Sequence, residues 1–485
     1  MSLLQEYLSE STSIKNKRYF PAFAKIAGAN LVANLFSLIT GMYLVRQFTP
    51  ELYGQITFLL ASFGIFRLLA TFGMGNRVTI DVARSISTNS RDSLNLVFYS
   101  LLLLRVFIAI ALVLIAIILA THNKTYAIVA IILLPASLND FNLAALQGGF
   151  RASLIAITIV AQPISYAFLA IPFVGYTHSL TAVYTALICS YIISMVVGLI
   201  SVKYLGLRFP RIKDFNLSYA KSSLGFIGNS FILGFAQYLF SIVSLYILGA
   251  RSLFSQAAQM GVIISLVYLP TSLLQLPTAA VFQARFVKIY DQEGLQSAAS
   301  FLSEFLLFGF QLCVIAAVIC IAFAKPIVLL LFGSQYASSS IALIILSPIM
   351  IMAVSQNIFI FTLMGLNKPQ VAIPSLLFQL IFVILICSII SITANGNVYL
   401  IAASQVIGAS LGTLLLFRKT TKLIPFPGKS KQYLFAIGMA ILSVLIIKIP
   451  LYWTRDTLFF NFLKMALVGT IYLVLMRKRL WVDLV

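Results

Sequence analysis

The stretch LNLVFYSLLLLRVFIAIALVLIAIILA, residues 94–120, decides the fold of this chain. As a helix rising 1.5 Å per residue, it is long enough to cross the roughly 30 Å hydrocarbon core of a bilayer. One arginine, Arg105, stands near its middle. An ionisable side chain near a bilayer centre costs at least about 2.5–3.5 kcal/mol on insertion scales. The stretch therefore predicts a membrane helix whose charged side chain faces a polar cavity or a partner.

Similar apolar runs recur along all 485 residues, of which 61% are hydrophobic and only 9% charged. Soluble proteins contain about 25% charged residues, so this composition is typical of an integral membrane protein. The runs are too long and continuous for a β-barrel, whose strands alternate over about ten residues. Residues 1–20 are polar and basic, which is unlike a removable signal peptide. We expect the first span to be the insertion signal of an all-α polytopic protein.

Fourteen transmembrane helices are predicted, and their order fixes the topology. They cover residues 22–47, 57–83, 94–120, 125–147, 152–175, 180–203, 217–249, 256–284, 299–323, 337–366, 370–392, 397–417, 432–449 and 457–476. With the N-terminus in the cytoplasm, 24 Lys and Arg residues lie on cytoplasmic segments and six outside. The positive-inside rule favours this orientation and places both termini in the cytoplasm. The net charge of +21 thus reports topology and does not indicate nucleic-acid binding.

Short internal matches relate the first six predicted spans to the next six. LYGQ at residues 52–55 is similar to LFSQ at 253–256, and LQGGFR at 146–151 is similar to LMGLNK at 363–368. An apolar chain can also produce such matches by chance. As a duplication, they predict two parallel six-helix repeats with a substrate cavity between them near the bilayer midplane.

Four motifs carry a resemblance to a known family: FTPELYG at residues 48–54, FGMG at 72–75, LQGGFR at 146–151 and LFGSQY at 331–336. With these motifs the chain resembles the polysaccharide transporter family, which includes the O-antigen (Wzx-like) flippases. That family belongs to the multidrug/oligosaccharidyl-lipid/polysaccharide exporter superfamily. The segment LGARSLF at 248–254 departs from the pattern, because it lacks the Gly-x-Tyr usual there.

The resemblance implies two six-helix bundles in a V shape, residues 1–207 and 208–420, followed by a helix pair at 421–485. It implies a flippase that carries an undecaprenyl-pyrophosphate-linked oligosaccharide, such as an O-antigen repeat unit, across the bacterial inner membrane by alternating access. Its partners would be the lipid bilayer and the polysaccharide polymerase and chain-length machinery, and no cofactor is implied. The alternative is a cation-coupled multidrug antiporter of the same superfamily, for which a surplus of buried arginine is unfavourable.

The candidate substrate-binding residues are basic: Arg67 and Arg105 inside predicted spans, and Lys25 near the start of the first. Guanidinium groups offer fork-shaped donors suited to a pyrophosphate. Asp140, the only acid in the middle of a predicted span, is either their charge partner or a proton or Na⁺ coupling site. A purely structural salt bridge between Asp140 and Arg67 or Arg105 is an equally open interpretation.

The remaining candidates are less specific. Lys464 either lines a lateral lipid groove or snorkels to the interface, and Pro270 and Pro277 permit kinks that would serve gating. Asp81 falls near a cytoplasmic helix end, where solvation makes charge inexpensive. Polar uncharged residues inside spans either contact sugar hydroxyls or hydrogen-bond between helices: Asn30, Asn34, Asn142, Gln147, Asn229, Gln237, Gln275, Gln356 and Asn357.

Metal and enzyme chemistry are not expected. The four cysteines all lie in apolar runs without CxxC spacing, which is typical of packing residues rather than of a metal site. The sequence carries no nucleotide-binding or hydrolase motif, so it predicts a transporter rather than an enzyme.

Overall fold

The computed structural model describes residues 19–87, 91–149, 151–205, 216–277, 282–366 and 368–424, and these are all-helical. The longer helices are α2 (Tyr19–Gln47), α3 (Pro50–Thr71), α4 (Met74–Ser87), α5 (Arg91–Ala120), α6 (Thr125–Gly148), α7 (Ala152–Thr177), α8 (Leu180–Lys203), α9 (Leu217–Ala250), α10 (Phe254–Pro277), α11 (Gln283–Glu293), α12 (Leu295–Ala322), α15 (Ile349–Gly365), α16 (Ile373–Thr393) and α17 (Val398–Thr421). Shorter elements are α13 (Ala324–Phe332), η3 (Ser334–Tyr336), α14 (Ser339–Leu346) and η4 (Pro369–Val371). Among the described residues, 11 helices are long and apolar enough to cross a membrane.

The second predicted span differs from the observed helices in its boundaries. Instead of one span over 57–83, α3 begins at Pro50 and α4 follows after a break. The side chain of Thr49 accepts a hydrogen bond from the backbone N–H of Leu52 and caps α3. Phe72 and Gly73 have φ angles of 43° and 69°, a left-handed turn that ends α3. Arg67 consequently lies about one turn before the end of its helix.

One further span in the second half differs from the prediction: α10 occupies the place of the predicted span 256–284, yet it is not among the 11 apolar helices. Predicted span 337–366 corresponds to one candidate membrane span, Ser339–Gly365, in which a break at Ser347 and Pro348 separates α14 from α15. The last two predicted spans, 432–449 and 457–476, lie outside the described residues.

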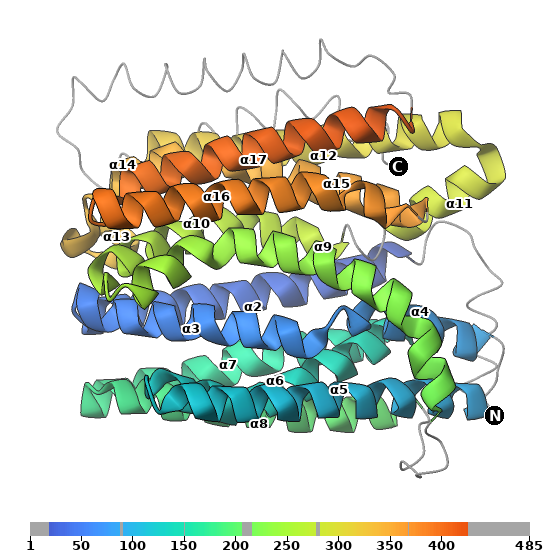
Figure 1. Ribbon diagram of the computed structural model, residues 1–485, viewed down its shortest axis with the longest axis horizontal. Coiled ribbons are helices and arrows are strands. Elements are labelled where there is room, and N and C mark those ends of the chain that lie inside the picture. The colour runs from blue at the N-terminus through green and yellow to red at the C-terminus, as the bar shows by residue number, and fades with distance from the viewer. Residues whose placement is uncertain are drawn as a thin grey trace.

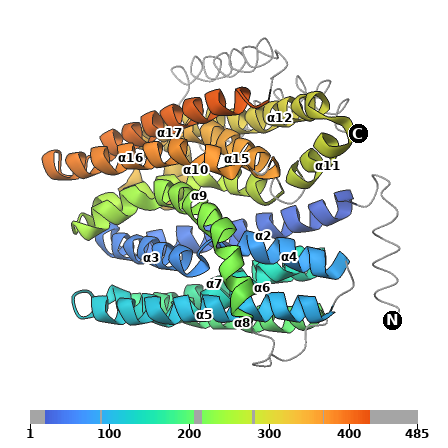
Figure 2. The ribbon, with the colours of Figure 1, turned by 45° about the vertical axis from the view of Figure 1, so that its right-hand side comes forward.

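The helices form two halves that meet along the middle of the molecule. Figure 1 shows α2–α8 in the lower half and α9–α17 in the upper half, with α2 and α3 facing α9 and α10. α9 crosses between them, because its first turns lie beside α4 and α5 and its later turns beside α16 (Figures 1 and 2). The predicted bundle boundary at 207/208 lies outside the described residues. The boundary at 420/421 falls in the last turn of α17.

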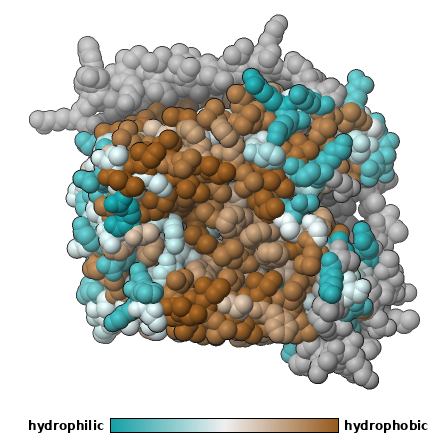
Figure 3. All heavy atoms as spheres, in the orientation of Figure 1, coloured by the Kyte–Doolittle hydropathy of each residue, from teal (hydrophilic) through white to brown (hydrophobic). Residues whose placement is uncertain are grey.

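The outer surface is apolar over a broad band. Figure 3 shows hydrophobic residues in the centre of one face and hydrophilic residues toward both ends of the helices. Large apolar side chains such as Phe107 and Phe168 are exposed at 67% and 69%. Because apolar surface in water costs about 25 cal/mol per Å², such a band requires lipid around it. The chain is a multi-pass membrane protein.

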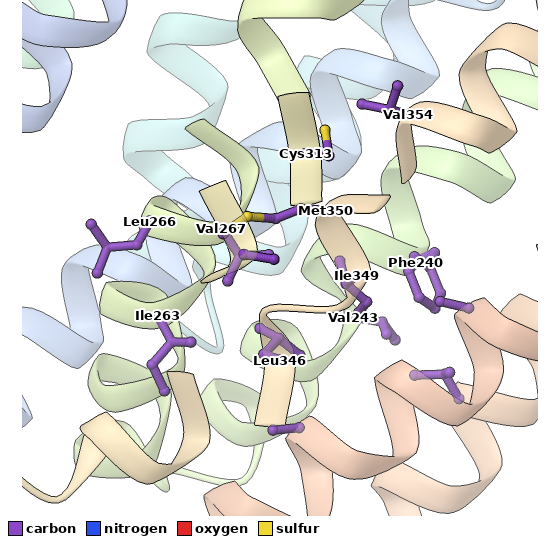
Figure 4. Close-up of a cluster of buried hydrophobic side chains, with 14 of the residues drawn as sticks. Phe240, Val243, Ile263, Leu266, Val267, Cys313, Leu346, Ile349, Met350 and Val354 are labelled. Carbon is purple, nitrogen blue, oxygen red and sulfur yellow. The ribbon is translucent and has the colours of Figure 1, made fainter. Parts of the chain in front are cut away.

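The upper half holds a continuous apolar core. Side chains from α9, α10, α12, α14 and α15 meet there, including Phe240, Val267, Cys313 and Met350 (Figure 4). Cys313 and Cys387 are fully buried in this core as free thiols. They act as the packing residues that the sequence predicted.

Small residues allow α3 to approach α9 and α10 closely. A Cβ on Gly54 would lie 1.9 Å from the carbonyl oxygen of Phe254. A Cβ on Gly261 would lie 2.6 Å from a methyl carbon of Thr57. These glycines occur near the end where α2 passes into α3, on the left in Figure 1, called here the α2–α3 end. Close backbone approach through small residues is the usual way in which membrane helices associate.

We expect Gly54→Ala to destabilise the junction between the halves, because the added methyl collides with backbone that cannot rotate away. Overpacking of this kind costs about 1–3 kcal/mol. Gly41→Ala on α2 is the matched control, since its Cβ meets nothing within 4 Å. An alanine there gains about 1 kcal/mol of helix propensity. In thermal unfolding in detergent, Gly54→Ala should have a lower midpoint than the wild type, and Gly41→Ala should not. Equal midpoints for Gly54→Ala and the wild type would contradict the close packing.

Candidate functional site

Arg67 on α3 and Asp140 on α6 form a two-bond ion pair. Nε of Arg67 donates to Oδ2 of Asp140 at 2.7 Å, and Nη2 lies 2.5 Å from Oδ1. This parallel arrangement is the strong, geometrically specific form of the arginine–carboxylate interaction. Of the partners considered for Asp140, the structure therefore places Arg67 closest.

Arg105 on α5 approaches the same carboxylate but does not hydrogen-bond to it. Its Nη2 atom lies 3.7 Å from Oδ2 of Asp140, while Nε donates to Oγ of Ser137 at 2.9 Å. The guanidinium carbon lies 5.7 Å from the centre of the Phe141 ring, within the range of a cation–π contact. Nη1 and Nη2 are buried without a hydrogen-bond partner among the described residues. Arg105 is thus held by α6 with two nitrogens left unsatisfied.

The three charged side chains differ in accessibility. Arg67 exposes 38% of its side chain and Asp140 16%, whereas Arg105 exposes 1%. Two guanidinium groups and one carboxylate leave a net charge of one positive unit. In this conformation the Arg67 side chain is partly accessible, whereas the Arg105 side chain is enclosed.

Two apolar clusters surround the charged group, and on α6 they flank Asp140. Phe98 and Phe141 belong to one cluster with residues of α4, and Phe63 and Leu133 belong to the other with residues of α8. On α6, Ala136 and Phe141 belong to different clusters, and Asp140 lies in the interval between them. The apolar clusters fix the three helices, and the charges occupy the polar layer that remains.

Two tyrosines from other helices complete the surroundings of Arg67. The Tyr191 ring of α8 packs edge-on against Phe63, 5.1 Å between centroids. A Cβ on Gly64 would lie 1.7 Å from the Tyr238 hydroxyl oxygen, so α9 of the upper half closes over α3 here. Both phenols lie in the neighbourhood of the Arg67 guanidinium. The sequence analysis missed them, because two among 21 tyrosines carry no distinguishing pattern.

A shallow, open pocket of about 200 Å³ lies between α3–α4 and α9. Leu68, the residue after Arg67, and Gly234, one turn before Tyr238, both line it. The full lining is Leu68, Thr71, Gly73, Gly75, Asn76, Ser230, Phe231 and Gly234, so Arg67 itself is not part of it. Hydroxyl, amide and glycine backbone groups thus line a pocket that begins one residue after Arg67 on α3.

The other predicted site residues do not join this group. Lys25 is exposed and its Nζ lies 3.4 Å from Oγ of Ser153 at the start of α7. Pro270 lies inside α10 and Pro277 is its last residue, so a gating role for either stays a prediction. Lys464 lies outside the described residues.

Asp81 is buried, contrary to the expectation of a solvated helix end. It is 4% exposed, and Nε of Arg77 lies 2.5 Å from its Oδ2. The hydroxyl of Tyr219 on α9 donates to the same oxygen. The first turns of α9 cover α4, and the Phe72 and Phe231 rings stack there at 4.7 Å. Coverage by a distant helix, which local sequence cannot reveal, excludes the solvent.

Several polar residues inside the spans hydrogen-bond between helices rather than facing one cavity. Asn30 and Asn34 donate to the carbonyl and hydroxyl oxygens of Ser272, at 2.8 and 3.1 Å, and join α2 to α10. Gln237 donates to Asn357 at 2.9 Å. These contacts favour the interpretation of interhelical hydrogen bonds.

Two family motifs meet at the α2–α3 end. Nε2 of Gln335 donates to the backbone oxygens of Val45 at 2.8 Å and Phe48 at 3.5 Å. The Tyr53 and Tyr336 rings pack edge-on, 6.5 Å between centroids. The η3 turn of the upper half thus satisfies carbonyls that the end of α2 leaves free. These contacts join the two halves at this end.

We expect Asp140→Asn to destabilise the protein, because it leaves two guanidinium groups without a counter-charge. Removing one partner of a buried pair costs about 3–5 kcal/mol. Arg105→Gln in the same chain removes one of the two cations and should recover part of that loss. Thermal unfolding of the wild type, Asp140→Asn, Arg105→Gln and the double variant gives a double-mutant cycle. Additive losses would show that Arg105 and Asp140 are not coupled.

Comparison with known proteins agrees with this architecture. The family described as Polysaccharide biosynthesis protein matches residues 43–341. Among solved structures, the lipid II flippase MurJ in an inward closed conformation aligns with a TM-score of 0.64 and 13% identity, over 93% of this chain and 99% of its own. An inward-facing multidrug resistance MATE transporter of the MOP superfamily gives a TM-score of 0.63 and 16% identity, over 81% of this chain and 95% of its own.

A mutant of the Vibrio cholerae MATE transporter VcmN aligns with a TM-score of 0.58 and 15% identity, over 86% of this chain and 97% of its own. No curated protein matches the sequence. The structural likenesses, at these low identities, show the fold, and the family match covers more than half of the chain. The predicted resemblance is confirmed: the chain belongs to the Polysaccharide biosynthesis protein family and has the fold of MOP-superfamily transporters.

Proposed function

We propose that this protein is a flippase that moves an undecaprenyl-pyrophosphate-linked oligosaccharide across the bacterial inner membrane by alternating access. The observation that carries the proposal is the partly accessible guanidinium of Arg67 in a group of net positive charge on the lower half, where α3 meets α9 of the upper half. Family membership supports a glycan cargo, and the likeness to a lipid II flippase supports a lipid-linked one.

The chemistry of such a cargo fits the site in three parts. Pyrophosphate oxygens accept the forked donors of Arg67, and a low dielectric strengthens that attraction. Thr71, Asn76 and Ser230 in the adjacent cavity offer polar groups to the first sugars. The apolar outer band accommodates the polyprenyl chain in lipid.

The transport direction follows from the orientation that we propose. With cytoplasmic termini, the α2–α3 end faces outward, where the Gln335 and Tyr336 contacts close it. The residues of the cavity near Arg67 lie toward the cytoplasmic side. In this proposal, residues 1–207 and 208–420 move as two bundles, and the protein acts as a transporter rather than as an enzyme. The polymerase and chain-length machinery would receive the unit released outside.

A multidrug antiporter is the second candidate, because MATE transporters are among the structural neighbours. The two candidates differ in the sign of the charge that they bind. The net positive charge around Arg67 repels a cationic drug and attracts an anion. The charge of the site therefore favours the flippase.

We expect undecaprenyl pyrophosphate to raise the unfolding temperature of the detergent-purified protein by several degrees, and Arg67→Ala to abolish the shift. A ligand at about 100 times its Kd stabilises the folded state by about 2.7 kcal/mol. Arg251→Ala, at the exposed α9–α10 turn, is the matched control and should respond like the wild type. Stabilisation by cationic drugs alone would favour the antiporter.

Closure of the α2–α3 end can be tested by a disulfide between α3 and α10. A Cβ on Gly261 would lie 3.4 Å from the Cβ of Thr57, close to the roughly 3.8 Å separation found in disulfides. We expect oxidation of Thr57→Cys/Gly261→Cys, in a chain without its native cysteines, to stop transport, and reduction to restore it. Each single cysteine variant is the control. Unchanged transport in the cross-linked protein would show that this end does not open.

A further inference from the structure

We propose that Arg105 is a reserve partner for Asp140: when a pyrophosphate binds Arg67 and displaces it from Asp140, Arg105 forms the ion pair with the carboxylate. Arg105 is then a positioning residue that lowers the cost of releasing Arg67, and it does not touch the cargo. The inference rests on the proposed function, because it concerns the same ligand at the same site.

The unsatisfied atoms of Arg105 are the first observation. Most buried polar groups find a hydrogen-bond partner, so two unpartnered guanidinium nitrogens on a side chain that is 1% exposed require an explanation. Neither cargo nor solvent reaches them in this conformation. The group that they approach is Oδ2 of Asp140, at 3.7 Å from Nη2. A shift of about 1 Å would bring these atoms to hydrogen-bond distance.

The occupancy of Asp140 is the second observation. Both of its oxygens are engaged by Arg67, and Oδ2 is the one that Arg105 approaches. A pyrophosphate that takes the Nε–Nη2 edge of Arg67 displaces Asp140, because those two nitrogens are the ones that now donate to its oxygens. A carboxylate left without a partner inside the bundle would make cargo binding less favourable, because an unpaired buried charge is strongly unfavourable. Arg105 reduces this free-energy cost, since it already carries the opposite charge beside Asp140.

The anchoring of Arg105 explains why it keeps this role. Its Nε atom is fixed by Ser137 and its guanidinium faces the Phe141 ring, both on the helix that carries Asp140. The terminal nitrogens of Arg105 therefore remain beside Asp140 when Arg67, on a different helix, releases it. One arginine binds the cargo, and the other keeps the carboxylate neutralised.

The test is the dissociation constant of undecaprenyl pyrophosphate for the full-length purified protein, in the wild type and in four variants: Arg67→Ala, Arg105→Gln, Asp140→Asn and Arg105→Gln/Asp140→Asn. We expect Arg105→Gln to weaken binding about tenfold or more, the order of one pair interaction. Asp140→Asn should bind at least as tightly as the wild type. In the double variant, binding should return to within about threefold of Asp140→Asn, because no carboxylate remains to be abandoned.

Other outcomes would overturn the proposal in distinguishable ways. If the double variant binds as weakly as Arg105→Gln, Arg105 contacts the cargo directly or acts only on the fold. If Arg105→Gln binds like the wild type while Arg67→Ala does not bind, the reserve role fails and the cationic site stands. If Arg67→Ala binds normally, the proposed site itself fails. Should Arg105→Gln not fold, Arg105→Lys with and without Asp140→Asn gives the same comparison, with a smaller effect.

Discussion

The ion pair between Arg67 and Asp140, set inside the helix bundle, is the interaction on which the lower half depends. A charge inside an apolar bundle is tolerated only when a partner and hydrogen bonds compensate for its lost hydration. Here one carboxylate on α6 serves guanidinium groups from α3 and α5, so it fixes three helices relative to one another. The surplus positive charge then makes this element of architecture a candidate site as well.

α3 connects this site to the contact between the halves. Gly54 and Gly64 let its backbone approach α10 and the Tyr238 hydroxyl of α9, and Arg67 follows Gly64 by about one turn. A movement of the upper half against α3 would therefore change the surroundings of Arg67 directly. Coupling between site and conformation needs no separate relay, because the same helix carries both.

The sequence predicted the features that depend on local composition. Apolar runs identified the helices, and the isolated charges Arg67, Arg105 and Asp140 were singled out because nothing nearby in the chain explains them. The sequence could not predict which arginine forms the closer ion pair with Asp140, since that depends on the angular positions of α3 and α5 around α6. The break at Phe72 and Gly73 was missed although the sequence changes there, because α3 is apolar whereas α4 alternates charged and apolar faces. Burial of Asp81 depends on α9, which is far away in sequence.

The family motifs and the charges carry different information. The motif at 48–54 and the motif at 331–336 meet at the α2–α3 end, where Gln335 and Tyr336 of one half hold Val45 and Tyr53 of the other. These motif residues hold the two halves together at one end. The charged group lies on the same helices but further along them, because Arg67 follows the motif at 48–54 on α3 and Asp140 precedes the motif at 146–151 on α6. α3 therefore carries both a contact between the halves and a member of the charged group, whose net positive sign favours anions over cations.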